Sequence, residues 1–186
     1  AETVDSYDIG LKYYARNLAF TAALFAYTYQ NFQQSFTDNQ TLESQTVTVG
    51  DSNMFGFEST IDYVFDDSLR VGANLGLLDA EFDKNTNVGS RFDYGGNTFR
   101  LAPELSAAFF FNKSVKIQHF DVAFDLISSY QTETFFESSN RPDLAQDAYW
   151  LTDVSIKLSK DNSPWKVELY ADNLLDEDYI IDAGNT

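Results

Sequence analysis

Several residue types and patterns are scarce in this 186-residue sequence, and each scarcity excludes a class of protein. There is no cysteine, so a disulfide framework and a thiolate metal site are both excluded. No apolar run reaches the roughly 18 residues that a membrane-spanning helix needs. Only 12 basic residues face 29 acidic ones, and the net charge of -17 repels the backbone of nucleic acids. We therefore expect neither a helical membrane protein nor a protein that binds nucleic acid.

Patterns of catalysis and cofactor binding are also missing. The single histidine, His119, borders an apolar run and has no serine or cysteine nucleophile pattern near it. No glycine-rich phosphate loop occurs. Asp176, Glu177 and Asp178 offer oxygen ligands, but they lack the spacing and central glycine of a calcium loop. The sequence predicts no enzyme activity, no cofactor and no metal site.

The residues that are abundant point to strands. Hydrophobic residues make up 44% of the chain and aromatic residues 16%, which excludes disorder, and the length suits one domain over residues 1–186. Side chains of a strand alternate between two faces. In residues 55–65 rings and aliphatic groups alternate with small or acidic groups, and no helix would sort them so. In residues 25–30 the rings of Phe25, Tyr27 and Tyr29 likewise predict one apolar face.

Short and long connections follow each other in strict succession. Short polar turns are expected near residues 16–17, 66–68, 112–114 and 161–164, whereas long polar loops are expected at 33–52, 83–98 and 132–147. Within the first loop, Gln45–Val49 would also suit an extension of a strand above the membrane. About eight strands result, each near or above the roughly 9 to 11 residues that cross a bilayer when tilted. Short turns on one side and long loops on the other are typical of a transmembrane β-barrel. The predicted fold is therefore all-β, an antiparallel transmembrane barrel.

The alternation assigns residues to two environments. The lipid-facing side is predicted to carry Phe55, Phe57, Ile61, Tyr63, Val122, Phe124 and Leu126, and the interior side, facing water or enclosed protein, to carry Glu58, Asp62, Asp121, Asp125, Lys166 and Glu168. Lys157 and Lys166 are too few to neutralise this acidic wall, so we expect basic groups from elsewhere and water to contribute. A soluble β-sheet protein with a structural or binding role, or a self-contained eight-stranded barrel, would also fit the alternation.

Six short motifs resemble, in order, those of the TonB-dependent outer-membrane receptors, over nearly the whole chain. They are Glu2–Lys12, similar to PExxxxYExGLK with Ala1 where proline is usual, Gly56-Phe57-Glu58, Leu77–Phe82, Ala102-Pro103-Glu104, Gln146–Tyr149, and Asn173–Tyr179, similar to NLxDExY. The resemblance places the chain in the C-terminal part of the barrel.

The resemblance implies a barrel of about 22 strands closed around an N-terminal plug. It also implies the outer membrane as location, lipid, the plug and TonB as partners, and active uptake of a scarce ligand such as a ferric siderophore. No plug, TonB box or closing strand is found within residues 1–186, so we expect a segment of a longer receptor. Loops on a rigid wall carry recognition, and Phe135, Phe136, Asn140 and Arg141 are the candidate ligand contacts.

Overall fold

The computed structural model describes residues 1–37, 44–84 and 93–184. Eight strands form one sheet in the order β1-β2-β3-β4-β5-β6-β9-β10, and every neighbouring pair is antiparallel. A second sheet joins the short strands β7 and β8. The strands are β1 Thr3–Tyr14, β2 Leu18–Thr37, β3 Ser44–Asp66, β4 Leu69–Phe82, β5 Leu105–Ile117, β6 Phe120–Gln131, β7 Thr134–Phe135, β8 Ala145–Gln146, β9 Tyr149–Lys160 and β10 Lys166–Ala171.

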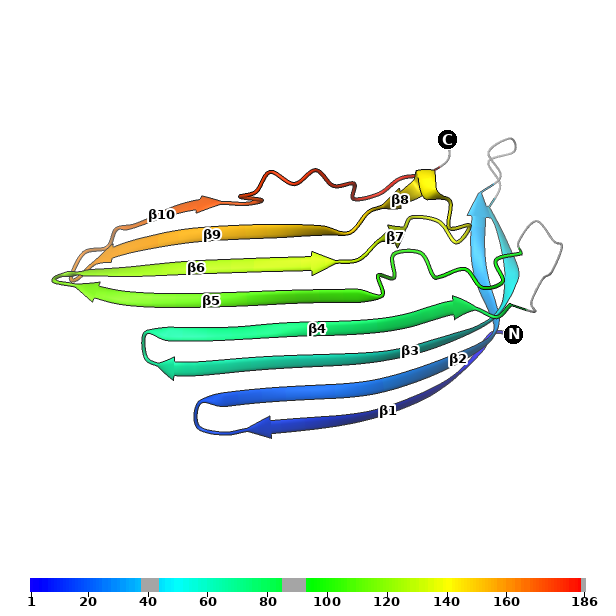
Figure 1. Ribbon diagram of the computed structural model, residues 1–186, viewed down its shortest axis with the longest axis horizontal. Coiled ribbons are helices and arrows are strands. Elements are labelled where there is room, and N and C mark those ends of the chain that lie inside the picture. The colour runs from blue at the N-terminus through cyan, green and yellow to red at the C-terminus, as the bar shows by residue number, and fades with distance from the viewer. Residues whose placement is uncertain (38–43, 85–92, 185–186) are drawn as a thin grey trace.

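The connections separate by length onto two ends of the sheet (Figure 1). At one end, called here the turn end, two to five residues join β1 to β2, β3 to β4, β5 to β6 and β9 to β10. At the other, the loop end, residues 83–104 join β4 to β5, and the connection from β6 to β9 contains β7, β8 and a 3-10 turn at Pro142–Leu144. The loop expected at 33–52 was wrong for most of its length, because β2 continues to Thr37 and β3 begins at Ser44. The expected all-β antiparallel fold is confirmed.

The third turn was misplaced by the sequence reading. Residues 112–114 belong to β5, which continues to Ile117, and the chain reverses at Gln118 and His119. Gln118 takes a left-handed φ of 56°, which suits a tight turn. The polar residues 112–114 resemble a turn, but Asn112 lies inside the strand, because its Nδ2 donates to Asp125 Oδ1 at 2.5 Å.

The strand register sorts the side chains into two faces, because residues directly opposite each other on neighbouring strands point to the same side. Starting at Asp62, the register leads through Gly72, Phe110 and Ile127 to Asp153. We call the side that carries these residues the charged face. Its opposite, reached from Tyr63 through Val71, Phe111, Leu126 and Val154, we call the apolar face.

Large side chains of the apolar face are exposed on most strands of the sheet. On the edge strands, the side chains of Ile9 and Leu169 are 71% and 69% exposed, and Phe55 in the third strand is 56% exposed. Within the described residues, no helix has the length and hydrophobicity to cross a membrane. A continuous exposed apolar surface of this kind marks a contact with lipid or protein.

The rings of β2 lie on the opposite face from the one that their alternation suggested. Phe25 pairs with Gly56, and Gly56 shares the charged face with Glu58. A Cβ on Gly56 would lie 2.1 Å from Phe25 Cζ, so the ring covers the glycine. Aromatic rings that cover strand glycines replace the packing that a side chain would supply. Alternation alone cannot assign the two faces of a strand whose small residues are alanines.

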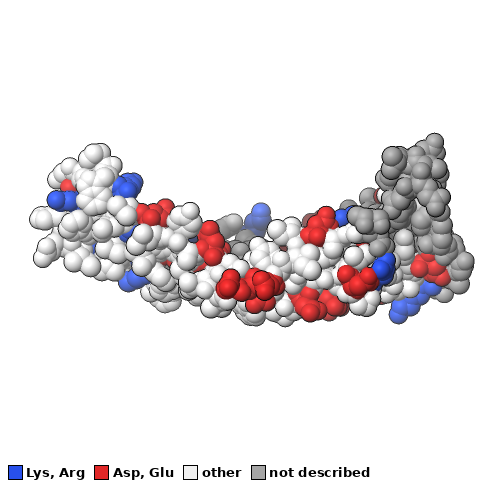
Figure 2. Space-filling model, turned by 90° about the horizontal axis from the view of Figure 1, so that it is seen from above, with Lys and Arg blue, Asp and Glu red and all other residues white. Residues whose placement is uncertain are grey.

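Residues are most deeply buried at the loop end, where the loops fold over the charged face. The most buried side chains include Phe82, 2% exposed, and Val49, 1% exposed. The ring of Phe82 contacts those of Phe32, Tyr94 and Phe99, with centroids 4.7 to 6.0 Å apart. Seen from above, the molecule is a curved plate (Figure 2). The loops thus cover one end of the charged face and leave the rest of that face open.

Candidate functional site

All six residues predicted to face the interior lie on the charged face. Glu58 and Asp62 project from β3, Asp121 and Asp125 from β6, and Lys166 and Glu168 from β10. The strand register places all six side chains on the same side of the sheet. The seven predicted lipid-facing residues, Phe55, Phe57, Ile61, Tyr63, Val122, Phe124 and Leu126, share the apolar face by the same register.

Arg70 forms the first ion pair on the charged face. Its Nε donates to Asp62 Oδ1 at 2.9 Å and to Oδ2 at 3.0 Å, and its Nη2 donates to the same carboxylate. The guanidinium also lies 5.5 Å from the ring centroid of Phe110. A fork of this kind holds the side chains of β3 and β4 in one geometry.

Asp125 is the centre of a second cluster. Its carboxylate accepts hydrogen bonds from Asn112 Nδ2 at 2.5 Å, Ser155 Oγ at 3.2 Å and Lys157 Nζ at 2.9 Å. Lys157 Nζ also lies 3.6 Å from Glu168 Oε1, so the cluster extends over β5, β6, β9 and β10. Asp125 keeps about a third of its side chain exposed, and such pairs hold geometry more than they add stability.

The wall therefore neutralises part of its own charge, through Arg70 as well as Lys157. Lys116 contributes a third contact, with its Nζ 2.8 Å from Asp161 Oδ1 and 3.8 Å from Asp121 Oδ1. These ion pairs all lie toward the turn end.

Nearer the loop end the charged face is less neutralised. Glu58 is exposed and has no ion pair with any described residue. It borders a groove of about 420 Å³ whose other polar members include Asn74, Ser106 and Gln131. Glu58, Gly76, Ser106, Gln131 and Tyr149 follow one another across five strands. Small side chains in this row leave space above the wall.

Hydrogen bonds of side chains join the loop connections to each other at the loop end. Asn140 Oδ1 accepts from the backbone N of Thr98 at 2.7 Å, and its Nδ2 donates to Thr98 O at 3.0 Å. Ser138 bonds with Asn97 through its carbonyl and with Gln34 through its hydroxyl. These bonds join the third loop to the second loop and to β2. The loop end is therefore a packed layer held by side chains.

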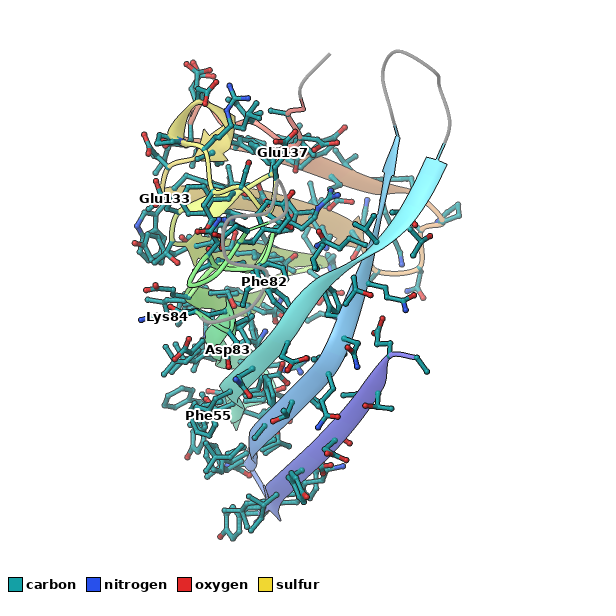
Figure 3. The ribbon with its side chains drawn as sticks, turned by 90° about the vertical axis from the view of Figure 1, so that its right-hand side faces the viewer. Phe55, Phe82, Asp83, Lys84, Glu133 and Glu137 are labelled. Atoms are coloured by element: carbon teal, nitrogen blue, oxygen red, sulfur yellow. The ribbon has the colours of Figure 1, made fainter. Side chains whose placement is uncertain are left out.

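The predicted ligand contacts occupy different places in this layer. Figure 3 looks onto the loop end, where Phe82 and Glu137 are labelled. Phe136 is 3% exposed and its backbone N donates to Leu144 O, so it packs inside the layer. The side-chain amide of Asn140 is already hydrogen-bonded to the backbone of Thr98. Phe135 and Arg141 are half-buried and keep some accessible surface.

Arg141 is paired within its own turn. Its Nε donates to Asp143 Oδ1 at 3.0 Å, and this contact lowers the pKa of the Asp143 carboxyl below its ordinary value. The same contact raises the pKa of Arg141. The pair closes the 3-10 turn that precedes β8. Among the described residues, no group of three or more acidic or histidine side chains is arranged to hold a metal ion.

A curved antiparallel sheet with one apolar face and one charged face, short turns at one end and long loops at the other, is a sector of a transmembrane β-barrel wall. The chain belongs to the family of TonB dependent receptor-like β-barrels, whose model matches residues 1–174.

Solved structures of such receptors share this fold. The ferric yersiniabactin uptake receptor FyuA from Yersinia pestis superimposes with a TM-score of 0.82 at 20% identity, covering 96% of this chain and 26% of that one. BauA, the ferric preacinetobactin receptor from Acinetobacter baumannii, gives 0.71 at 18%, covering 95% and 26%. The copper transporter OprC gives 0.66 at 15%, covering 96% and 26%. The chain thus spans about a quarter of the length of the receptors that it matches.

Proposed function

We propose that this chain is the C-terminal part of the barrel wall of an outer-membrane receptor that takes up a ferric siderophore, with energy relayed by TonB. Its apolar face meets outer-membrane lipid, and its charged face meets an enclosed plug domain and water. The part of the wall formed by residues 1–186 performs no catalysis. Residues 1–186 then form part of one barrel domain.

The observation that supports this proposal is the sorting of side chains by register over all eight strands, within a chain of this family. A soluble sheet would need a second layer to cover Ile9, Phe55 and Leu169, which are among the exposed side chains of the apolar face. A small closed barrel would have to pair β1 with β10, whereas both are edges of the open sheet. A larger wall gives both edges a neighbouring strand.

The choice of a ferric siderophore as ligand is supported by similar proteins alone. FyuA is a ferric yersiniabactin uptake receptor, BauA a ferric preacinetobactin receptor and FecA a ferric citrate transporter, whereas OprC is a copper transporter. The test uses the complete gene that contains this segment. Cells that lack it should lose uptake of radioactive iron supplied as one ferric siderophore, and the gene should restore uptake only when TonB is present. Uptake that persists without TonB, or failure with every ferric siderophore while copper uptake changes, contradicts the proposal.

A further inference from the structure

The groove of about 420 Å³ beside Glu58 lies directly beneath the packed layer at the loop end. Its first row of side chains crosses the charged face from Glu58 through Gly76, Ser106 and Gln131 to Tyr149. Ser106, Gln131 and Tyr149 lie at or next to the loop-end termini of β5, β6 and β9. A molecule that enters between the loops therefore reaches this groove before it reaches the ion pairs of the wall.

A second row of side chains continues the groove toward the turn end. It consists of Thr60, Asn74, Ala108, Ser129 and Leu151, which the register places side by side. The side chains of Asn74 and Ser129 form no hydrogen bond with any described residue. Amide and hydroxyl groups without a partner in the wall can bond to a molecule that occupies the groove.

The two ends of the first row differ in character. Glu58 is the charged residue among those that line the groove, and it is exposed. At the other end the ring of Tyr149 is stacked on that of Tyr179, with centroids 5.0 Å apart and planes 16° from parallel. Four strand spacings separate Glu58 from Tyr149, which is roughly 19 Å at about 4.8 Å each. The shape suits an extended molecule with a cation at one end.

The groove offers nothing to balance an anion. No basic side chain is among the described residues that line it. Arg70 and Lys157 lie on the charged face closer to the turn end, and both are paired, Arg70 with Asp62 and Lys157 with Asp125. An anionic molecule in the groove would meet only the like charge of Glu58, which repels it.

The loops above the groove carry the same sign of charge. In residues 93–104 and 132–148 the basic side chains are Arg100 and Arg141, and the acidic ones are Asp93, Glu104, Glu133, Glu137, Asp143 and Asp147. Arg141 is paired with Asp143. An excess of one sign of charge around an entrance raises the local concentration of ligands of the opposite sign. The charge of the loops and that of the groove therefore favour the same class of ligand.

We propose that this groove binds the protonated amine of an extended ferric siderophore, and that the receptor selects cationic ferric complexes over anionic ones. The ammonium group donates charge-assisted hydrogen bonds to the Glu58 carboxylate. Amide and hydroxyl groups of the siderophore bond to Asn74 and Ser106, and its methylene groups pack against Tyr149. The inference rests on the proposed function, because it takes the ligand to be a ferric siderophore.

The test compares ferric complexes that differ only in the charge at one end of the siderophore. A linear tris-hydroxamate with a free terminal amine is a cation, its N-acetyl form is neutral and its N-succinyl form is an anion. Binding to the purified complete receptor, measured by quenching of tryptophan fluorescence, should be about tenfold tighter for the cation than for the neutral complex and weakest for the anion. A second series on a tris-catecholate scaffold is measured in the same way. The preference should shrink as sodium chloride is added, because salt screens the charges.

Variants of Glu58 connect this preference to the groove. Glu58→Gln should reduce the preference for the cation over the neutral complex about tenfold, and Glu58→Lys should reverse it in favour of the anion. The variant Asp67→Asn, in a turn, should keep the preference of the unchanged receptor. Heat-modifiable gel mobility of each variant reports that the barrel is folded. If Glu58 pairs with a basic side chain of the plug instead, its substitution changes the affinity of all the complexes by the same factor.

Each other outcome overturns a defined statement. Equal affinities within a series, tighter binding of the anion, no binding of either series, or a preference that both Glu58 variants keep overturns the assignment of the amine. TonB-dependent uptake confined to ferric siderophores without an amine overturns it as well and leaves the proposed function in place. TonB-dependent uptake of no ferric siderophore, whatever its charge, contradicts the proposed function itself.

Discussion

Replacing Gly72 by alanine should destabilise the barrel wall, because the charged face has no space above this residue. A Cβ at Gly72 would lie 2.0 and 2.4 Å from two ring atoms of Phe110 and 2.6 Å from the carbonyl oxygen of Ile61. The ring can rotate away, but the carbonyl belongs to the neighbouring strand and moves only with the backbone. The substitution therefore cannot be absorbed by one side chain.

The expected cost follows from these contacts. Overpacking of this kind costs about 1 to 3 kcal/mol. A displaced Phe110 ring also loses its contact with the guanidinium of Arg70, worth about 0.5 to 1 kcal/mol at an exposed site. We expect Gly72→Ala to lower the free energy of unfolding by about 2 to 4 kcal/mol. In the background Phe110→Ala the same change should cost less, with a remainder due to Ile61.

The matched control is Gly10→Ala, also in a strand and on the charged face. A Cβ there would lie 3.5 Å from Ala22 O, which is an ordinary contact. Because alanine restricts the unfolded chain, this variant should be neutral or more stable by up to about 1 kcal/mol. Denaturant unfolding of the complete receptor in detergent, followed by heat-modifiable mobility, measures both. Equal stability of the two variants would refute the argument that the Phe110 ring occupies the place of a side chain.

Three further predictions concern the faces and the loops. Leu75→Arg, on the apolar face, should destabilise the folded barrel by about 2 to 4 kcal/mol, measured as a smaller folded fraction in membranes, whereas Asn74→Arg, on the charged face, should be tolerated; equal losses would contradict the assignment of the faces. Asn140→Ala should lower the free energy of local opening of the second loop by about 1 to 3 kcal/mol in hydrogen exchange, and Asn74→Ala should not. The pKa of Asp143 is lowered by Arg141, so the turn should be fully stable above the unfolded value of about 3.9 and lose stability as the pH falls through the lower folded value. Exchange rates corrected for intrinsic chemistry check this, and Asp143→Asn should abolish the pH dependence.

Much of the wall could be predicted from the residues in chain order. The alternation in residues 55–65 sets which side chains share a face whatever the neighbouring strand is, and the structure keeps that grouping. The turn at residues 66–68 was also placed correctly, and there Asp66 Oδ1 accepts hydrogen bonds from the Ser68 backbone N and hydroxyl. Both features depend on contacts within a few residues, which a sequence contains directly.

Features that depend on neighbouring strands could not be predicted in the same way. Residues 112–114 have the composition of a turn, but Asn112 is held in β5 by Asp125 of β6. The rings of β2 lie on the charged face, where the ring of Phe25 covers Gly56 of β3. The candidate ligand contacts were chosen by residue type, and Phe136 is only 3% exposed, with its backbone N bonded to Leu144 O.

The sequence by itself determined the all-β class, the two-sided character of each strand and the family, because strand periodicity and short motifs are local properties of the chain. Only the tertiary structure decided which rings face which side, which carboxylates of the wall are paired, and that Glu58, Ser106, Gln131 and Tyr149 border one groove. The physical reason is register: a shift of one residue between strands moves every side chain to the other face, and register is set by contacts between strands.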